Sequence, residues 1–285
     1  MNKINKLQEI LKNMKSVLIA YSGGVDSTFL LKIAKDVLKE NVFAVIAKSE
    51  TYPEREYKEA IKLVKNLKVE YLTITTKELL NQNFFTNSQE RCYYCKKELF
   101  TKLKQIAFEK NINYVIDGTN YDDTKDFRPG VKAICELGIQ SPLKETGFTK
   151  KEIRLLSQKM NLSTWNKPSF ACLASRIPYG EKITEEKLAM IEKAESYLCK
   201  LGFKQVRIRH HNNIARIEVF PEEIPNFIIS SVYEKIVQKL KKIGYKYITL
   251  DLEGYRTGSM NEVLKNDVLK NKILKKRSFR KGKNG

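Results

Sequence analysis

The stretch Ser22-Gly-Gly-Val-Asp-Ser-Thr28 lies between a short apolar run and an amphipathic helix pattern, and it decides the fold. The apolar run 17–20 is typical of a buried strand, and apolar residues recur at helical spacing from Phe29 onward. Gly23 and Gly24 allow backbone conformations that are closed to residues with a Cβ atom. The amides at the start of the helix point into the turn. The pattern therefore predicts a strand, a phosphate-binding turn and a helix.

This turn lacks the two commonest nucleotide-binding patterns. Neither GxxxxGK[ST] nor GxGxxG occurs here, which argues against the usual NTPase and dinucleotide-binding loops. The motif SGGxDS resembles instead the PP-loop of ATP pyrophosphatases, which hold the pyrophosphate end of ATP. The resemblance assigns ATP and pyrophosphate binding to Ser22, Gly23, Gly24, Asp26, Ser27 and Thr28. The plainer alternative is an ordinary turn capped by Ser or Asp.

Length and composition predict a globular protein of two domains. The chain has 285 residues, of which 42% are hydrophobic and 30% charged. No apolar run approaches the roughly 20 residues that span a bilayer, and the polar N-terminus lacks a signal core. We therefore expect a cytoplasmic protein without a membrane partner. The five cysteines, an odd number, argue against a secreted disulfide framework and favour metal or catalytic roles for clustered thiols.

The net charge of +20 raises the alternative of a nucleic-acid-binding protein, because basic surfaces attract phosphate chains. Lysine is spread over nearly every predicted helix, however, which is typical of a solvated surface. Only the end of the chain, from Lys275, is a concentrated basic run, and we expect a basic tail at 265–285.

Strands and helices alternate through the first half of the chain. After an N-terminal helix we expect strands at 16–21, 42–47, 69–75 and 114–119 and helices at 27–39, 53–67, 96–109 and 150–159, the last capped by Thr149. This alternation predicts an α/β domain with a parallel sheet covered on both faces. The site should lie at the carboxyl ends of the strands, beside the glycine turn, residues 48–50 and residues 117–120.

A long loop, 165–180, separates this region from a smaller one. It is rich in Pro, Ser and Arg and contains Cys172 and the only Trp, a composition that favours a functional loop. The second region predicts a helix at 183–201, strands at 206–210 and 215–220, a helix at about 224–243 and a strand at 247–252. We therefore expect a nucleotide-binding domain at 1–180, a small α+β domain at 181–264 for substrate binding or oligomerisation, and the tail.

Cysteines form the second chemical signal. Cys92 and Cys95 form a CxxC pair, and three thiolates that include Cys172 would suit zinc or an iron–sulfur centre. A redox dithiol, zinc and a cluster are comparable explanations of the CxxC pair alone, and Cys172 favours the cluster. A Cys₃His zinc site with His210 or His211 is less favoured. Cys135 and Cys199 fall in helical patterns and are expected to pack as small apolar residues.

Several arginines lie near motifs rather than on plain helix faces. Arg207 and Arg209 alternate along a predicted strand and so point the same way, which would make a two-pronged anion clamp. The alternative is a pair of solvated charges partnered by Glu218 across the hairpin. Spacing alone does not choose between these two interpretations.

Taken in order, SGGVDST, NKPSFACLASRIPYG, VRIRHHNNIARIEV and EGYRTGSMNE resemble the LarE family of ATP-dependent sulfur transferases in nickel-pincer cofactor assembly. The resemblance runs nearly end to end. It implies a PP-loop (adenine nucleotide alpha hydrolase-like) domain that uses ATP and Mg²⁺. It also implies sulfur insertion into pyridinium-3,5-biscarboxylic acid mononucleotide through carboxylate adenylylation, and a homo-oligomer that takes sulfur from a sulfide or another donor.

The same resemblance assigns roles to individual residues. Asp26, Cys172, Ser175 and Arg176 would act at the reacting site, and Arg207, Arg209 and Arg256 would hold the substrate. Members of the sacrificial type give up the sulfur of the cysteine that matches Cys172. The added Cys92 and Cys95 resemble instead the variant that binds a [4Fe-4S] cluster through three cysteines, which we favour.

Two other functions remain as alternatives. A tRNA-thiolating enzyme would use the same PP-loop with a three-cysteine cluster, and the +20 charge favours it. The lack of a recognisable RNA-binding module argues against it. A non-enzymatic iron–sulfur scaffold or RNA-binding adaptor would bind nucleotide without releasing pyrophosphate.

Overall fold

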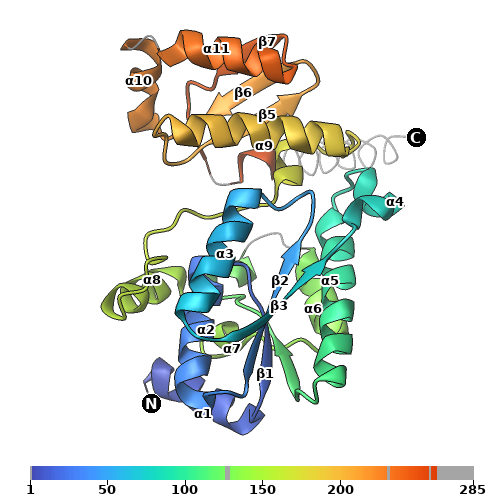
Figure 1. Cartoon of the computed structure of the whole chain (residues 1–285), viewed down its shortest axis with the longest axis vertical. Coiled ribbons are helices and arrows are strands. Elements are labelled where there is room, and N and C mark those ends of the chain that lie inside the picture. Colours follow the sequence, from blue (N-terminus) through green and yellow to red (C-terminus); the bar gives the residue numbers. More distant parts are fainter. Residues whose placement is uncertain (1, 126–128, 230–231, 257, 262–285) are drawn as a thin grey trace, which may run out of the picture. The chain divides into compact units, whose positions relative to one another are not determined.

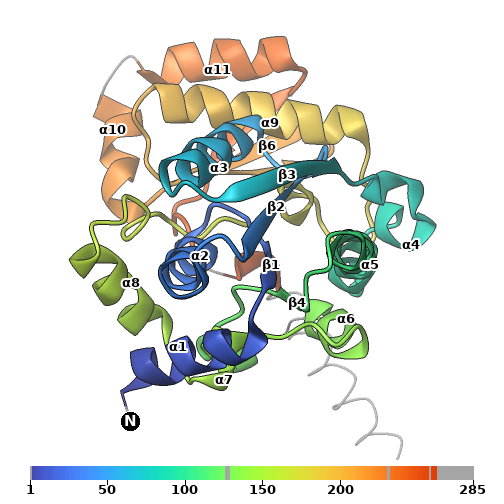
Figure 2. The same cartoon turned by 60° about the horizontal axis from the view of Figure 1, so that its bottom comes forward.

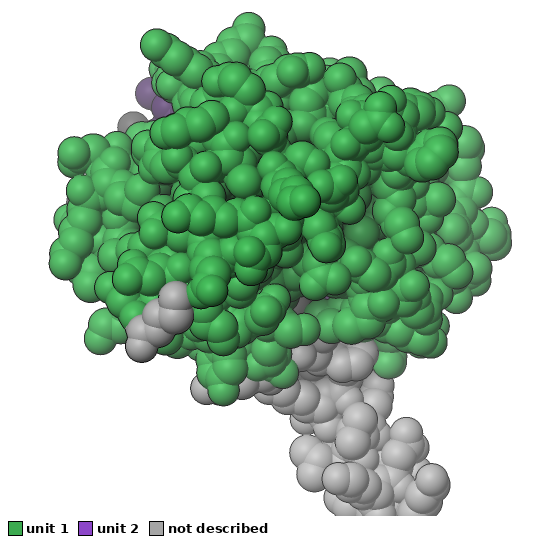
Figure 3. All heavy atoms as spheres, turned by 90° about the horizontal axis from the view of Figure 1, so that it is seen from below, with its two compact units in different colours: residues 1–174, 179–189 green, residues 175–178, 190–285 purple. Residues whose placement is uncertain are grey.

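The computed structural model describes residues 2–125, 129–229, 232–256 and 258–261 (Figure 1). The chain divides into two compact units, which Figure 3 colours separately. The first unit comprises Met1–Ala174 and Tyr179–Ala189, and the second comprises Ser175–Pro178 and Met190–Gly285. The predicted basic tail, 265–285, lies outside the described residues.

A parallel sheet forms the centre of the first unit. Its strands are β1 (Val17–Ala20), β2 (Val42–Lys48), β3 (Glu70–Thr75) and β4 (Tyr114–Ile116), in the order β3-β2-β1-β4. All three strand pairings are parallel. This confirms the predicted α/β class, and it brings the carboxyl ends of all four strands to one edge.

Helices cover both faces of this sheet (Figure 2). One face packs against α1 (Lys3–Met14), α2 (Val25–Leu38), α3 (Glu54–Asn66), α7 (Pro142–Glu145) and α8 (Lys150–Lys159), and the other packs against α5 (Arg91–Glu109) and α6 (Gly130–Glu136). The side chains of β1 alternate between the two cores, since Val17 and Ile19 lie in one and Leu18 in the other. Shorter turns of helix are η1 (Glu78–Leu80), α4 (Gln82–Phe85), η2 (Asp122–Lys125) and η3 (Leu173–Arg176).

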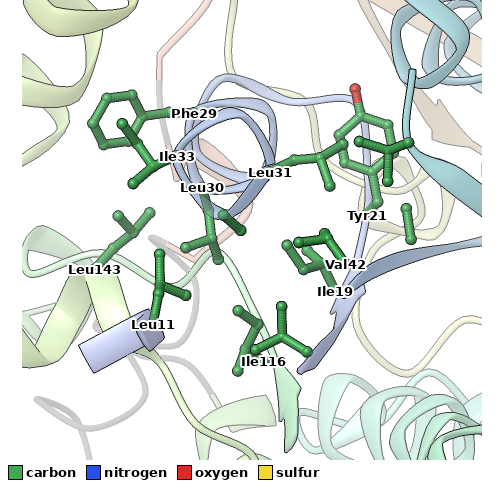
Figure 4. Close-up of a cluster of buried hydrophobic side chains, with 14 of the residues drawn as sticks. Leu11, Ile19, Tyr21, Phe29, Leu30, Leu31, Ile33, Val42, Ile116 and Leu143 are labelled. Carbon is green, nitrogen blue, oxygen red and sulfur yellow. The ribbon is translucent and has the colours of Figure 1, made fainter. Parts of the chain in front are cut away.

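Helix α2 contributes many buried residues to the larger of the two cores that flank the first sheet (Figure 4). Leu30 faces Leu11 of α1, and Phe29 meets Phe148 edge to face with ring centroids 5.6 Å apart. A helix that is apolar on nearly every side packs between other elements. The glycine turn that starts α2 is therefore anchored by one of the best-packed helices in the unit.

The start of α8 confirms a predicted cap. The Thr149 hydroxyl accepts a hydrogen bond from the amide of Glu152, and the Glu152 carboxylate accepts one from the amide of Thr149 at 2.8 Å. This reciprocal arrangement satisfies two amides that have no partner within the helix.

Helix α5 starts at Arg91, five residues before the predicted start at 96. The CxxC pair therefore lies in its first turn and a half rather than in a preceding loop. The prediction was wrong because Cys92, Tyr93 and Tyr94 do not continue the apolar spacing of the later turns, and they are not buried in the structure.

The second unit contains a mixed three-stranded sheet. Strands β5 (Arg207–His211) and β6 (Ile214–Glu218) pair antiparallel, and β7 (Tyr247–Leu250) pairs parallel with β6. The other elements are α9 (Glu185–Lys200), which begins in the first unit, and α10 (Ile224–Ile229), α11 (Val232–Ile243), η4 (Pro221–Glu223) and η5 (Ser259–Asn261). This confirms the smaller domain of mixed α and β structure.

The single helix predicted at 224–243 was wrong, because α10 and α11 are separate helices. Phe227 and Ile236 are both buried and line the same apolar pocket. Nine residues in one helix turn through about 900°, so these two side chains would face opposite sides. Two helices allow both side chains to reach the same core.

Candidate active site

The glycine turn joins β1 to α2 at the carboxyl edge of the first sheet. Gly23 has φ +61°, and a Cβ atom there would lie 2.8 Å from the Cβ of Ala60. Both the backbone conformation and the close approach of α3 therefore require glycine. Gly24 caps α2, and the hydroxyls of Ser22 and Ser27 lie 3.1 Å apart across the turn. The exposed amides at this helix start can bind an anion.

Asp26 lies in the first turn of α2 and is held by two residues from later in the chain. Lys150, the first residue of α8, forms an ion pair with it, and Asn120 donates a hydrogen bond at 3.3 Å. The predicted strand-end segment 117–120 thus reaches this site. No sequence motif marks Lys150 as a site residue, although the Thr149 cap marks the helix start that places it.

The end of β4 also supports the turn. Gly118 lies so close that a Cβ atom there would be 3.0 Å from the amide nitrogen of Ser27. The buried carboxylate of Asp117 accepts hydrogen bonds from the Thr119 and Ser141 hydroxyls at 2.5 and 2.7 Å. These contacts fix the segment after β4 against the glycine turn.

The first unit brings the three predicted cysteine ligands into one neighbourhood. Burial raises the pKa of the Cys95 thiol well above its ordinary value, and the nearby Glu78, Cys172 and Cys92 raise it further. The Cys95 sulfur lies 3.7 Å from Oε1 of Glu78. Leu173 is next to Cys172, and its amide donates a hydrogen bond of 2.8 Å to the carbonyl of Thr51, which lies just after β2.

These thiols are not arranged as ligands of a single ion. Among the described residues, no group of three or more His, Cys, Asp or Glu side chains could hold one metal ion. A cluster of several irons is wider than one ion, so its cysteine ligands stand farther apart. The three cysteines are therefore of the residue type that binds an iron–sulfur cluster.

Charged and aromatic groups surround the cysteines. Glu78 is buried, and its Oε1 accepts a hydrogen bond from Thr76 at 2.9 Å. Burial raises the pKa of Glu78. The buried Arg91 guanidinium stacks on the Tyr179 ring, with its central carbon 4.3 Å from the centroid. Glu78 and Arg91 were not predicted as site residues, because neither belongs to a spacing motif.

Cys135 was predicted to be a packing residue, and this was wrong. It lies on α6 but is exposed, because the buried side of that short helix is formed by Ala133 and Ile134. Cys199 on α9 is half-buried.

Two of the predicted arginines form buried ion pairs in the second unit. Arg176 donates to both oxygens of Glu195 at 2.9 and 3.0 Å. Arg209 donates to both oxygens of Glu218 at 2.9 and 2.7 Å. The Glu218 pairing was the alternative interpretation of the hairpin, but the pair is buried rather than solvated.

Ser175 joins these two ion pairs. Its hydroxyl oxygen lies 2.9 Å from Nη1 of Arg176, and its carbonyl accepts a hydrogen bond from Arg209 at 3.1 Å. Burial would raise the pKa of Glu195, but Arg176 and then Arg207 outweigh it and hold that pKa below its ordinary value. The structure thus brings together the predicted Ser175, Arg176, Arg207 and Arg209 within the second unit.

Arg207 has a different environment. It lies 5.3 Å from the Tyr255 ring centroid and donates to the Val206 carbonyl at 2.8 Å. Burial and the neighbouring Arg176 charge lower its pKa to about 10. Arg256, the last predicted arginine, forms an ion pair with Glu253.

None of the described helices is both long and apolar enough to cross a membrane.

Comparison with known proteins places the chain among ATP-using enzymes with this fold. A sequence model of the NAD synthase family matches residues 3–122. An uncharacterized protein of Synechocystis is 43% identical over 263 residues, covering 92% of this chain and 98% of that protein. A GMP synthase of Aeropyrum pernix is 27% identical over 62% of this chain and 38% of its own length.

One characterised relative matches nearly the whole chain. The pyridinium-3,5-bisthiocarboxylic acid mononucleotide synthase of Lactiplantibacillus plantarum is 39% identical over 255 residues, covering 89% of this chain and 92% of that enzyme. The glycine turn before α2, the parallel sheet and this match agree with one another. The chain belongs to the LarE family of PP-loop enzymes.

Proposed function

We propose that this protein uses ATP to convert the two carboxylates of pyridinium-3,5-biscarboxylic acid mononucleotide into thiocarboxylates, the precursor of the nickel-pincer cofactor. The observation that carries this proposal is the common position of two groups at one sheet edge. The glycine turn follows β1. Cys95 contacts Glu78, which follows β3, and the loop that contains Cys172 contacts Thr51, which follows β2. The residues proposed to activate the carboxylates and those proposed to supply sulfur belong to the same unit, which supports this proposal.

Activation begins with attack of a substrate carboxylate oxygen on the α-phosphorus of ATP. The bond from that phosphorus to the oxygen that bridges the α- and β-phosphates breaks. This leaves AMP joined to the carboxylate as an acyl-adenylate and releases pyrophosphate. Ser22–Thr28 would bind the pyrophosphate through the amides at the start of α2. Asp26 has a carboxylate that could bind Mg²⁺. When bound, Mg²⁺ would offset the negative charge of the phosphates.

Sulfur transfer follows activation. Cys92, Cys95 and Cys172 would hold a [4Fe-4S] cluster, which would supply an iron site for a transferable sulfide when bound. In the sacrificial alternative, the Cys172 thiolate attacks the acyl carbon and AMP leaves. Elimination then removes the Cα proton of residue 172 and breaks its Cβ–S bond. The bonding electrons leave with sulfur as the product thiocarboxylate, and dehydroalanine remains in the protein.

The arginines of the second unit suit an anionic substrate. Arg176 pairs with Glu195. Arg209 pairs with Glu218, and Arg216 pairs with both Glu218 and Asp251. Arg207 lies close enough to Arg176 and Glu195 to interact with both charges. A buried guanidinium whose surroundings disfavour its charge gains strongly from an incoming anion. Arg207, Arg209 and Arg256 would hold the phosphate and carboxylates of the substrate, with Ser175 and Arg176 beside the reacting group.

We also propose that the chain forms a homo-oligomer through its second unit. An open apolar pocket of about 450 Å³ lies between α11 and β7, and Tyr233 and Tyr247 are exposed nearby. Light scattering of the purified protein tests this proposal, and a monomer at all concentrations would contradict it.

Iron and sulfide analysis of anaerobically purified protein distinguishes the two sulfur mechanisms. We expect about four irons per chain, as three cysteines and a [4Fe-4S] cluster imply. A colourless protein after anaerobic reconstitution would contradict the cluster. If turnover then lowered the intact mass by one H₂S, Cys172 would be the sulfur donor.

A further inference from the structure

Two side chains donate hydrogen bonds to consecutive carbonyls of the glycine turn. The Tyr52 hydroxyl donates to the carbonyl of Ser22 at 2.8 Å. The Lys167 ammonium donates to the carbonyl of Gly23 at 3.2 Å. Both donors approach the turn from its carbonyl side.

Tyr52 also contacts the loop that carries Cys172. Its ring meets Phe170 edge to face, with centroids 5.7 Å apart. The preceding residue, Thr51, accepts the hydrogen bond from the amide of Leu173. Residues on both sides of Cys172 are therefore tied to the segment that contains Tyr52.

Lys167 belongs to the same loop, and its position is strongly constrained. Its side chain is 11% exposed and pairs with Glu56 at 2.8 Å and with Glu59 at 2.9 Å. Arg154 of α8 donates to the Lys167 carbonyl at 2.7 Å. The ammonium group cannot leave the Gly23 carbonyl without disturbing a nearly buried ion pair.

The chemistry of the turn gives these contacts a consequence. An anion bound by the amides polarises the same peptide groups whose carbonyls face Tyr52 and Lys167, and chains of hydrogen bonds strengthen cooperatively. A change in the turn on binding must therefore act on both donors. Since one donor belongs to the Cys172 loop and the other packs on it, the change reaches that loop.

We infer that Tyr52 and Lys167 are positioning residues that couple occupancy of the nucleotide turn to the order of the Cys172 loop. This inference rests on the proposed binding of ATP by Ser22–Thr28. The coupling orders the sulfur-bearing loop while the adenylate is present. Neither side chain needs to touch the reacting atoms.

Hydrogen exchange with mass spectrometry tests the coupling in the anaerobically purified full-length protein. The probe is an ATP analogue with methylene between the α- and β-phosphorus atoms, which binds without adenylylation. In the parent protein we expect saturating analogue to slow exchange in segments 18–28 and 168–173. The slowing of exchange in 168–173 should be about fivefold, which is the change in an equilibrium constant that one ordinary hydrogen bond supplies.

Tyr52→Phe is the primary variant, because it removes the hydroxyl that contacts Ser22 and keeps the ring on Phe170. Exchange in 18–28 should still slow, while the slowing in 168–173 should fall to less than about twofold. Lys167→Gln should act in the same direction. Tyr71→Phe controls for loss of a tyrosine hydroxyl elsewhere in the unit. Glu59→Gln controls for loss of one ion pair of Lys167, because the pair with Glu56 is kept.

The outcomes separate this inference from the proposed function. Slowed exchange in 18–28 without any effect in 168–173 of the parent would overturn the coupling and leave ATP binding standing. Full slowing of both segments in Tyr52→Phe and Lys167→Gln would overturn it as well. If the analogue slowed neither segment of the parent, ATP binding at the turn would be refuted and the coupling with it.

Discussion

The glycine turn of the first unit and the arginine network of the second unit both suit anions, but they are built differently. At the turn, anion-binding groups are backbone amides, and side chains such as Tyr52 and Lys167 hold the carbonyl side. In the second unit, Arg176 and Arg209 are each neutralised by a buried carboxylate. Substitutions near the turn should therefore reduce activity more than stability, and substitutions in the arginine network should reduce stability first.

The largest effect is expected from Asp26→Ala. The Asp26 side chain is partly exposed and is not part of the apolar core, so the fold should persist. Pyrophosphate release with ATP and the dicarboxylate should fall by about 100- to 1,000-fold, as for loss of a preorganised electrostatic group. The measurement is a coupled pyrophosphate assay.

Asp36→Ala is the matched control for this change. Asp36 lies on the same helix and forms an exposed i,i+4 pair with Lys32. Its loss should leave pyrophosphate release near the parent value. Equal rates for Asp26→Ala and the parent would refute the nucleotide-binding role of the turn.

Glu218→Gln tests the arginine network of the second unit. Glu218 is fully buried and pairs with Arg209, so the variant leaves a buried guanidinium without its counterion. The free energy of unfolding should fall by about 3–5 kcal/mol, measured by urea denaturation.

The control for Glu218→Gln is Glu253→Gln, which weakens an exposed ion pair with Arg256. Exposed pairs contribute about 0–1 kcal/mol. Similar losses of stability in both variants would show that burial does not distinguish the arginine network.

Cys95→Ser tests whether the edge of the first unit holds iron. The Cys95 sulfur contacts the buried Glu78 carboxylate. Iron content should fall below about a tenth of the parent value, because a cluster needs its thiolate ligands. Cys135→Ser, at an exposed position on α6, should retain full iron content. Equal iron loss in both variants would argue against the proposed ligand set.

The smallest effect concerns Glu152, which links Lys3 to the start of α8. The Lys3 ammonium, followed by the Thr149 amide, lowers the pKa of Glu152 from 4.5 to about 2. A lowered pKa stabilises the fold above the unfolded value and loses this effect as the pH falls through the folded value. Glu152→Gln should therefore lower the melting temperature slightly at pH 7. The difference from the parent should shrink between pH 4.5 and 2, and a constant difference over that range would contradict the assignment.

Local patterns in the sequence predicted much of the first unit. The apolar runs of β1 and β2 and the Thr149 cap each depend on neighbours within a few residues, so spacing was sufficient. The two glycines of the turn were recognisable for the same reason. The start of α5 was not, because Cys92 and Tyr93 are not buried and add nothing to its apolar pattern.

Long-range polar contacts were beyond prediction from spacing. Lys150 and Asp26 are 124 residues apart in the chain, and Lys167 and Gly23 are 144 apart. The hairpin did suggest Glu218 as a partner for the arginines, but strand periodicity gave no sign that Arg209 is buried. These contacts depend on which loops meet at a sheet edge, and that arrangement is a property of the folded chain.

Sulfur insertion is tested most directly by a single-turnover reaction with ATP, Mg²⁺ and pyridinium-3,5-biscarboxylic acid mononucleotide under anaerobic conditions. Mass spectrometry of the small molecule and a pyrophosphate assay are read together. We expect the substrate to gain the mass difference between sulfur and oxygen, with one pyrophosphate released for each replacement. Pyrophosphate release with an unchanged or oxygen-only product, or sulfur gain without pyrophosphate, would contradict carboxylate activation followed by sulfur transfer.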